Sequence, residues 1–174
     1  NLFRTELGLP FYSVIGNHDL VGARPKDGSP PAADPRSEYL DFFKLKSTYR
    51  SVDRSGYHLI MLDSVQIESP PQKFSGKVDA KQTVWLQEDL SRVPKDRPII
   101  LITHMPLLSS FYQATKGGLA AAPANQIVSN NRQILEQFKN HNLLLVLQGH
   151  LHVNEILQWR GTTFITGGAI CGGW

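Results

Sequence analysis

Three short stretches of the chain combine imidazoles, an amide and a carboxylate, which are side chains that can bind metals or transfer protons. They read Gly16-Asn17-His18-Asp19, Thr103-His104 and Gly149-His150-Leu151-His152. Neutral imidazoles with an oxygen ligand suit zinc, iron or manganese. The chain has a single cysteine, Cys171, which excludes an internal disulfide and a zinc site built from thiolates. These residue types therefore predict a metal centre with nitrogen and oxygen ligands.

Each stretch directly follows an apolar run that is typical of a buried strand, namely residues 11–15, 98–103 and 143–148. Gly16 permits a sharp turn after the first of them. The tips of neighbouring strands converge at one edge of a sheet, which is where α/β proteins place their chemistry. If the segment of His150 and His152 is extended, both imidazoles lie on one face of it. We therefore expect the polar side chains to form one cluster.

Each stretch also has a simpler interpretation when it is taken alone. His104 could be a histidine whose hydrogen bonds are satisfied in the core, Asn17 could be a turn residue, and Asp19 could cap the next element. Three such strand ends in one chain favour the metal centre instead. His58 lies within a predicted strand and His141 at a polar helix end, so we assign structural roles to both.

The remaining pattern predicts an alternation of helices, strands and long loops. Residues 2–7 are expected to form the end of a helix, and further helices are expected over 37–43, from 79 to the proline at 94, and over 126–139. Hairpins are expected over 48–53 with 57–62 and over 153–159 with 162–166. Residues 64–78 are expected to be a loop, and the breaker-rich loops 24–35 and 109–125 would determine the substrate.

Composition sets the class of molecule. With 174 residues, 41% of them hydrophobic, the chain suits one globular domain over residues 1–174. A net charge of +3 without a dense basic face argues against sequence-specific nucleic-acid binding. The longest apolar run, residues 143–147, is too short to span a membrane. The location is undetermined, because the composition suits a cytoplasmic or an exported bacterial protein equally.

The order of the three stretches resembles the calcineurin-like metallophosphoesterase superfamily. The intervening segments agree, because residues 57–63 resemble its hairpin strand and residues 82–90 resemble its helix with a Trp-Leu pair. The match covers nearly the whole chain. The resemblance implies an α/β fold in which two mixed β-sheets pack as a sandwich flanked by helices, with a binuclear metal centre at the strand tips.

The resemblance also implies a role for each matching residue. Asn17, His104 and His150 would bind one divalent metal ion, and His152 would bind the other. His18 would contact the phosphate or protonate the leaving oxygen, and Asp19 would orient His18. Two Mn, Fe or Zn ions would clamp the phosphoryl oxygens and lower the pKa of water, to about 7 in the best-known zinc case. The implied reaction is the hydrolysis of phosphomonoesters or phosphodiesters, in a small or a polymeric substrate.

One part of the family pattern does not occur in this chain. The family places Asp-x-His and Gly-Asp-x-x-Asp before Gly-Asn-His-Asp, and these motifs supply most ligands of the first metal. Because Asn1 follows the pattern of a helix interior, we expect that an amino-terminal portion precedes it, and that the segment alone is inactive. Two alternatives stay open: an inactive pseudoenzyme that binds metal or phosphate, and a purely structural interaction domain.

Overall fold

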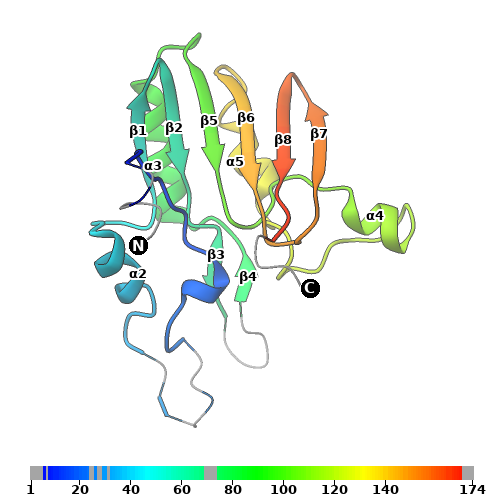
Figure 1. Cartoon of the computed structure of the whole chain (residues 1–174). Coiled ribbons are helices and arrows are strands. Elements are labelled where there is room, and N and C mark those ends of the chain that lie inside the picture. Colours follow the sequence, from blue (N-terminus) through cyan, green and yellow to red (C-terminus); the bar gives the residue numbers. More distant parts are fainter. Residues whose placement is uncertain are drawn as a thin grey trace.

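A mixed six-stranded sheet forms the centre of the molecule in the computed structural model, which describes residues 6, 8–23, 26, 29–30, 32–68 and 74–169. Its strands run in the order β1 (Arg50–Arg54), β2 (Tyr57–Met61), β5 (Pro98–Ile102), β6 (Asn142–Gln148), β8 (Thr162–Thr166) and β7 (Glu155–Trp159). The four inner strands are parallel, and the outer strands β1 and β7 are antiparallel to their neighbours. The carboxyl ends of the inner strands therefore meet at one edge, the lower edge in Figure 1.

Both predicted hairpins are confirmed, and their turns explain why. Ser55 and Gly56 have φ values of 49° and 84°, and Arg160 and Gly161 have values of 51° and 81°. Two consecutive left-handed residues match the right-handed twist of the strands on either side. Glycine supplies the second of these positions without a steric penalty.

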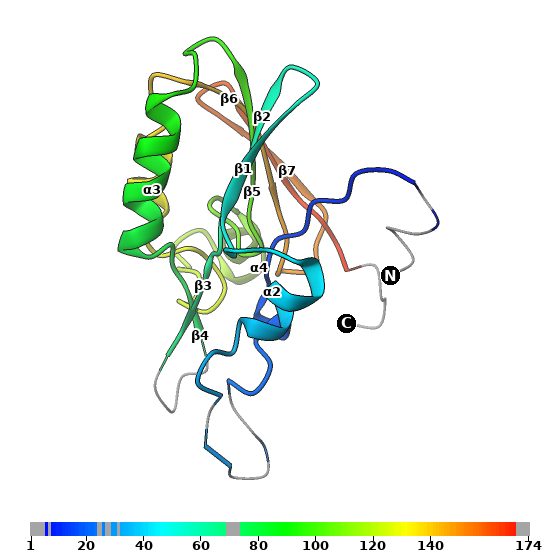
Figure 2. The ribbon, with the colours of Figure 1, turned by 90° about the vertical axis from the view of Figure 1, so that its left-hand side faces the viewer.

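Two helices, α3 (Ala80–Ser91) and α5 (Asn131–Glu136), lie on the same face of this sheet, and Figure 2 shows α3 along it. The core between them and the sheet consists of branched and aromatic side chains, including Ile60, Ile99, Leu101, Val146 and Phe164 from the strands and Leu86, Leu90 and Ile134 from the helices. The Asp79 carboxylate accepts a hydrogen bond of 2.8 Å from the Gln82 amide, which caps α3 as its sequence predicts.

Helix α5 is shorter than the predicted span of 126–139. The backbone amide of Val128 donates to the Pro106 carbonyl at 2.9 Å, and the amide of Ser129 donates to the Gly76 carbonyl at 2.8 Å. The residues before α5 therefore make hydrogen bonds to backbone that is distant in the sequence, in place of helical ones. The prediction was wrong there because periodicity alone does not reveal such partners.

Three other expectations differ from the structure. Residues 11–15 form no strand, and in place of a ladder the carbonyl of Ser13 accepts from the Arg50 guanidinium at 2.8 Å. The expected loop 64–78 contains a two-stranded ribbon, β3 (Val65–Ile67) with β4 (Phe74–Gly76), and the loop 109–125 contains α4 (Phe111–Lys116). Strands of three residues are too short for an alternating pattern to be recognised. The expected helix over 2–7, apart from Glu6, and Cys171 lie outside the described residues.

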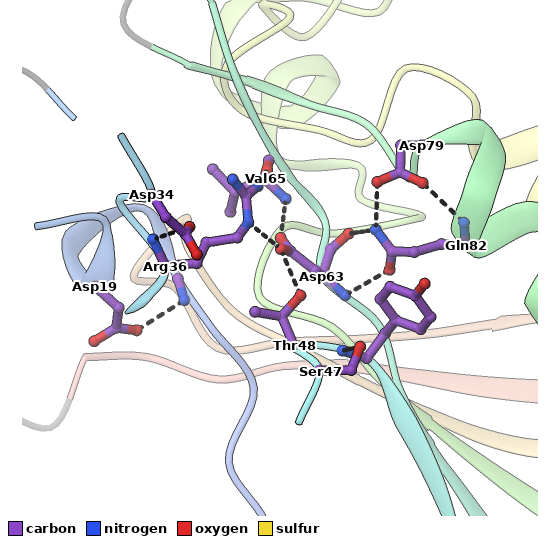
Figure 3. A network of polar contacts seen from close by, with 11 residues as sticks. Asp19, Asp34, Arg36, Ser47, Thr48, Asp63, Val65, Asp79 and Gln82 are labelled. Atoms are coloured by element: carbon purple, nitrogen blue, oxygen red, sulfur yellow. Dashed lines mark hydrogen bonds and ion pairs between the residues drawn. The ribbon is translucent and has the colours of Figure 1, made fainter. Parts of the chain in front are cut away.

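Helix α2 (Ser37–Phe43) is confirmed, and a polar network ties its start to the sheet. The Arg36 guanidinium donates to the buried Asp63 carboxylate at 2.7 Å, and the Thr48 hydroxyl donates to the same oxygen at 3.0 Å (Figure 3). The Gln82 side chain bonds both the amide and the carbonyl of Asp63, each at 3.0 Å. Asp63 thus joins α2, the end of β2 and α3 beside the edge where the strands converge.

Candidate metal centre

Three predicted ligands meet at the carboxyl edge of the sheet. His104 follows β5 and His150 follows β6, and a one-turn 3₁₀ helix, η1 (Asn17–Asp19), brings the amide to the same place. The Asn17 Oδ1 atom lies 2.7 Å from His104 Nε2 and 3.1 Å from His150 Nδ1, and these two nitrogens lie 3.1 Å apart. The parallel pairing of β5 with β6 sets the two imidazoles side by side.

The distances between these three donor atoms fit a metal ion. With metal–ligand distances of about 2.1 Å, adjacent ligands lie about 3.0 Å apart in an octahedral site and about 3.4 Å apart in a tetrahedral one. The observed 2.7, 3.1 and 3.1 Å agree better with one face of an octahedron. The described part of the chain contains no group of three or more His, Cys, Asp or Glu side chains that could hold a metal ion. The trio is not such a group, because its third donor is the amide oxygen of Asn17.

Both imidazoles are held in the neutral form that metal binding requires. Burial, followed by the charges of His150, His18 and His152, lowers the pKa of His104 to about 4. Burial also lowers the pKa of His150, although the hydrogen bond to the Asn125 carbonyl opposes that shift. At neutral pH each ring therefore has a lone pair available for a metal.

Position 16 requires glycine because the His104 ring approaches its backbone closely, and not because of its backbone angles. Its φ of −113° is open to any residue, so the predicted need for a flexible turn was wrong. A Cβ on Gly16 would lie 2.9 Å from His104 Nδ1 and 3.0 Å from Cε1. The His104 ring thus packs directly on the Gly16 backbone, a contact between residues that are distant in the sequence.

Asp19 closes the turn that presents Asn17 and His18. Its carboxylate accepts a hydrogen bond of 2.8 Å from the Gly16 amide, and its own amide donates to the Gly16 carbonyl at 3.2 Å. His18 is exposed. The expected contact from Asp19 to His18 stays a prediction, whereas the hold of Asp19 on Gly16 is a feature that sequence reasoning missed.

The segment of His150 and His152 is not extended, which corrects the expected arrangement. The φ angles are 71° at His150 and 56° at His152, so both residues adopt the left-handed conformation. That conformation costs of the order of 1–3 kcal/mol for a residue other than glycine, and such strain gathers at functional sites. The charges of His152 and His18 act on His104, which places both residues near the trio.

The other two histidines make structural contacts, as predicted. His58 is buried between two carboxylates, with Nδ1 2.7 Å from Asp53 and Nε2 2.8 Å from Asp89. His141 Nε2 lies 2.9 Å from Lys95 Nζ.

Comparison with known proteins identifies the family of this chain. A sequence model described as calcineurin-like phosphoesterase matches residues 1–154. The chain belongs to the calcineurin-like phosphoesterase family. Members of this family hydrolyse phosphoesters and generally use divalent metal ions. The family predicted from the three polar stretches is confirmed.

Individual relatives agree with this family. The chain is 24% identical to a "probable cyclic nucleotide phosphodiesterase" of Psychrobacter arcticus over 95% of its length, but it spans only 54% of that relative. It also resembles the structures of a dimetal phosphatase from Danio rerio and of a phosphopantetheinyl hydrolase from Mycobacterium tuberculosis. The TM-scores are 0.54 and 0.53, the identities 14% and 12%, and 89% of this chain is covered in each case.

These two structures are covered over 60% and 68% of their own chains. The likeness confirms the predicted α/β fold of the metallophosphoesterase type, in which the second sheet of the described chain is the ribbon β3–β4. No helix in the described ranges of this chain has the length and apolar character to cross a membrane.

Proposed function

We propose that this chain is the later part of a phosphoesterase domain with a binuclear metal centre. Asn17, His104 and His150 hold one divalent ion, and His152 contributes to the other. The observation that carries this proposal is the approach of three donor atoms to 2.7–3.1 Å of one another, with both imidazoles neutral.

When bound, two such ions polarise phosphoryl oxygens and lower the pKa of water, which favours attack on phosphorus. His18 stands exposed on η1 beside the ligand Asn17, where its imidazole can reach a bound phosphoester. The family resemblance assigns to His18 the transfer of a proton to the leaving oxygen, as a general acid. Asp19 supports this role by closing the turn that carries His18.

A phosphodiester is the first substrate class to examine. The curated relative is described as a probable cyclic nucleotide phosphodiesterase, and it aligns with nearly the whole of this chain. A cyclic nucleotide and a phosphomonoester with the same leaving group would separate diesterase from monoesterase activity. The substrate loops predicted at 24–35 and 109–125 flank the sequence segments that carry the ligands.

The test uses the full-length protein, whose metal content and turnover of bis-p-nitrophenyl phosphate are measured together. His104→Ala and His150→Ala should each lose bound metal and turnover, and His18→Asn should keep the metal but lower kcat by about 10²–10⁴-fold. His141→Gln is the matched control, because His141 contacts Lys95 and not the trio.

Two results would contradict the proposal in different ways. Bound metal without turnover of any phosphoester would identify a metal-binding pseudoenzyme. Unchanged metal content in both His104→Ala and His150→Ala would show that the trio holds no metal and would favour a structural domain.

A further inference from the structure

We propose that the ribbon β3–β4 and the Asn125 carbonyl are positioning elements for His150, which fix its ring so that Nδ1 faces the metal centre. This inference rests on the proposed function, since it concerns how one of the proposed ligands is held. The resemblance that identified the ligands does not involve the ribbon, whose residues lie in a segment that was expected to be a loop.

Two further contacts hold the His150 ring. Its Nε2 atom lies 2.8 Å from the Asn125 carbonyl oxygen, which can only accept a hydrogen bond. The proton is therefore assigned to Nε2, and the lone pair to Nδ1, the atom that faces Asn17 and His104. The Phe74 ring of β4 packs edge to face on the same imidazole, with centroids 5.9 Å apart at 81°.

Strand β4 also holds the backbone segment that supplies the carbonyl. The Gly76 amide donates to the Ala124 carbonyl at 2.7 Å, and the Gly76 carbonyl accepts from the Ser129 amide at 2.8 Å. The Ser129 hydroxyl donates to that same carbonyl at 2.9 Å, and Gly76 forms a parallel bridge with Val128. One residue of β4 thus anchors the chain both before and after Asn125.

This anchoring depends on the absence of a side chain at Gly76. A Cβ there would lie 2.1 Å from the Ile127 carbonyl oxygen, 2.6 Å from its carbon and 2.9 Å from Met105 Sδ. The first two atoms are backbone, so they cannot move aside as the end of a flexible side chain would. Any larger residue must separate β4 from residues 124–129 and withdraw the Asn125 carbonyl from His150.

The first measurement is NMR of the metal-free, full-length protein with ¹⁵N-labelled histidine. The parent should show an Nε2–H resonance that is protected from solvent exchange and that disappears in His150→Gln. Gly76→Ala should remove this protection and weaken Mn²⁺ binding by about 10-fold or more. Gly118→Ala is the matched control, because a Cβ at Gly118 meets no atom within 4 Å, and it should behave as the parent does.

Phe74→Leu provides a second variant that leaves the backbone of β4 without a clash. It should speed exchange of the His150 Nε2–H and weaken Mn²⁺ binding, and it decides the question if Gly76→Ala fails to fold. The inference is overturned if the folded variants keep both the protected resonance and an affinity within about twofold of the parent. Weaker binding with an unchanged resonance overturns it too, since the effect would then reach the metal by another route.

His104→Ala separates this inference from the proposed function. If His104→Ala abolishes Mn²⁺ binding while Gly76→Ala and Phe74→Leu do not weaken it, the metal centre stands and the positioning role fails. If His104→Ala binds Mn²⁺ as the parent does, the proposed centre itself fails.

Discussion

At the scale of single residues, the candidate site depends on three side chains that are kept uncharged and close together. Burial lowers the pKa of His104 to about 4, which removes the repulsion between two imidazolium rings whose nearest nitrogens lie 3.1 Å apart. The amide of Asn17 contributes an oxygen without adding a charge. The trio therefore offers a neutral set of donors, and a cation there meets no competing positive charge from its own ligands.

Gly16→Ala tests the packing of the His104 ring at this scale. The added methyl would lie 2.9 Å from Nδ1, so the ring must shift and change its position relative to Asn17 and His150. We expect Mn²⁺ affinity to fall by about 10-fold, similar to the loss of a residue that orients a ligand. Titration of Mn²⁺ into the full-length protein measures this, with Gly118→Ala as the control. An affinity equal to that of the parent would show that the contact with Gly16 does not position the ligand.

The types of the ligating residues were predictable from the sequence, but their supports were not. Asn17, His104 and His150 each follow an apolar run, which is a local signal. Gly16 and Asn125 act through contacts with residues far away in the chain, His104 and His150 respectively. A carbonyl group also carries no signature in the sequence, because every residue has one.

At the scale of secondary-structure elements, His58 connects β2 to β1 and α3. The hydrogen bond with Asp89 raises the pKa of His58, burial opposes the shift, and Asp53 adds to it. Burial alone would raise the pKa of Asp89, but the hydrogen bonds from His58 and Ser51 hold it below its usual value. The bond to His58 likewise lowers the pKa of Asp53, which also binds Arg97 at 2.8 Å. The three side chains thus form a charged link between sheet and helix.

This link gives a stability that depends on pH with a defined sign. The contribution of His58 is fully present below its unfolded pKa of 6.5 and is lost as pH rises through the raised folded value. The contributions of Asp53 and Asp89 are present above 3.8 and are lost as pH falls through their lowered values. The link is therefore strongest between these two limits.

His58→Gln tests the link. Removing a hydrogen-bonded charge from the partly buried Asp89 should lower the free energy of unfolding by about 2 kcal/mol near pH 5.5. The loss of stability should be smaller near pH 9, because His58 no longer stabilises the parent protein there. Urea unfolding at several pH values measures both. The control His141→Gln should show the opposite dependence on pH, with a smaller loss of stability at low pH than at high pH. The reason is that burial and then Lys95 lower the pKa of His141, so its protonation at low pH destabilises the folded parent. A loss independent of pH would contradict the charged form of His58.

The elements that the sequence predicted well are those stabilised by their own pattern. β5 and β6 are continuous β-branched and leucine-rich runs, and α3 has a cap and an apolar stripe. Residues 11–15 show the limit, because an apolar run becomes a strand only where another strand pairs with it. Phe42 in α2 is another case, since this large apolar side chain is 58% exposed. Intrinsic propensity and hydrophobic periodicity do not reveal which other elements pack against a segment in the folded protein.

At the scale of the whole molecule, a metal ion at the trio should couple to folding. An ion that binds only the folded state raises the free energy of unfolding by about 2.7 kcal/mol when the free ion is at 100 times its Kd. Addition of Mn²⁺ to chelator-treated full-length protein should therefore raise the melting temperature, and His104→Ala should abolish the shift while His141→Gln keeps it. Calorimetry measures this. Equal melting temperatures with and without Mn²⁺ would argue against the centre, whatever the catalytic result.

The positions of the donors also determine the order in which the site can be assembled. His104 and His150 follow strands that pair directly, so the ladder between β5 and β6 brings them together. Asn17 joins from a segment that has no ladder, across sequence separations of 87 and 133 residues. Closing such long loops lowers the entropy of the chain, and this loss is offset only after other contacts have formed. We therefore expect the two imidazoles to meet first and Asn17 to arrive last, and the reverse opening at Asn17 to be the route by which a bound ion leaves.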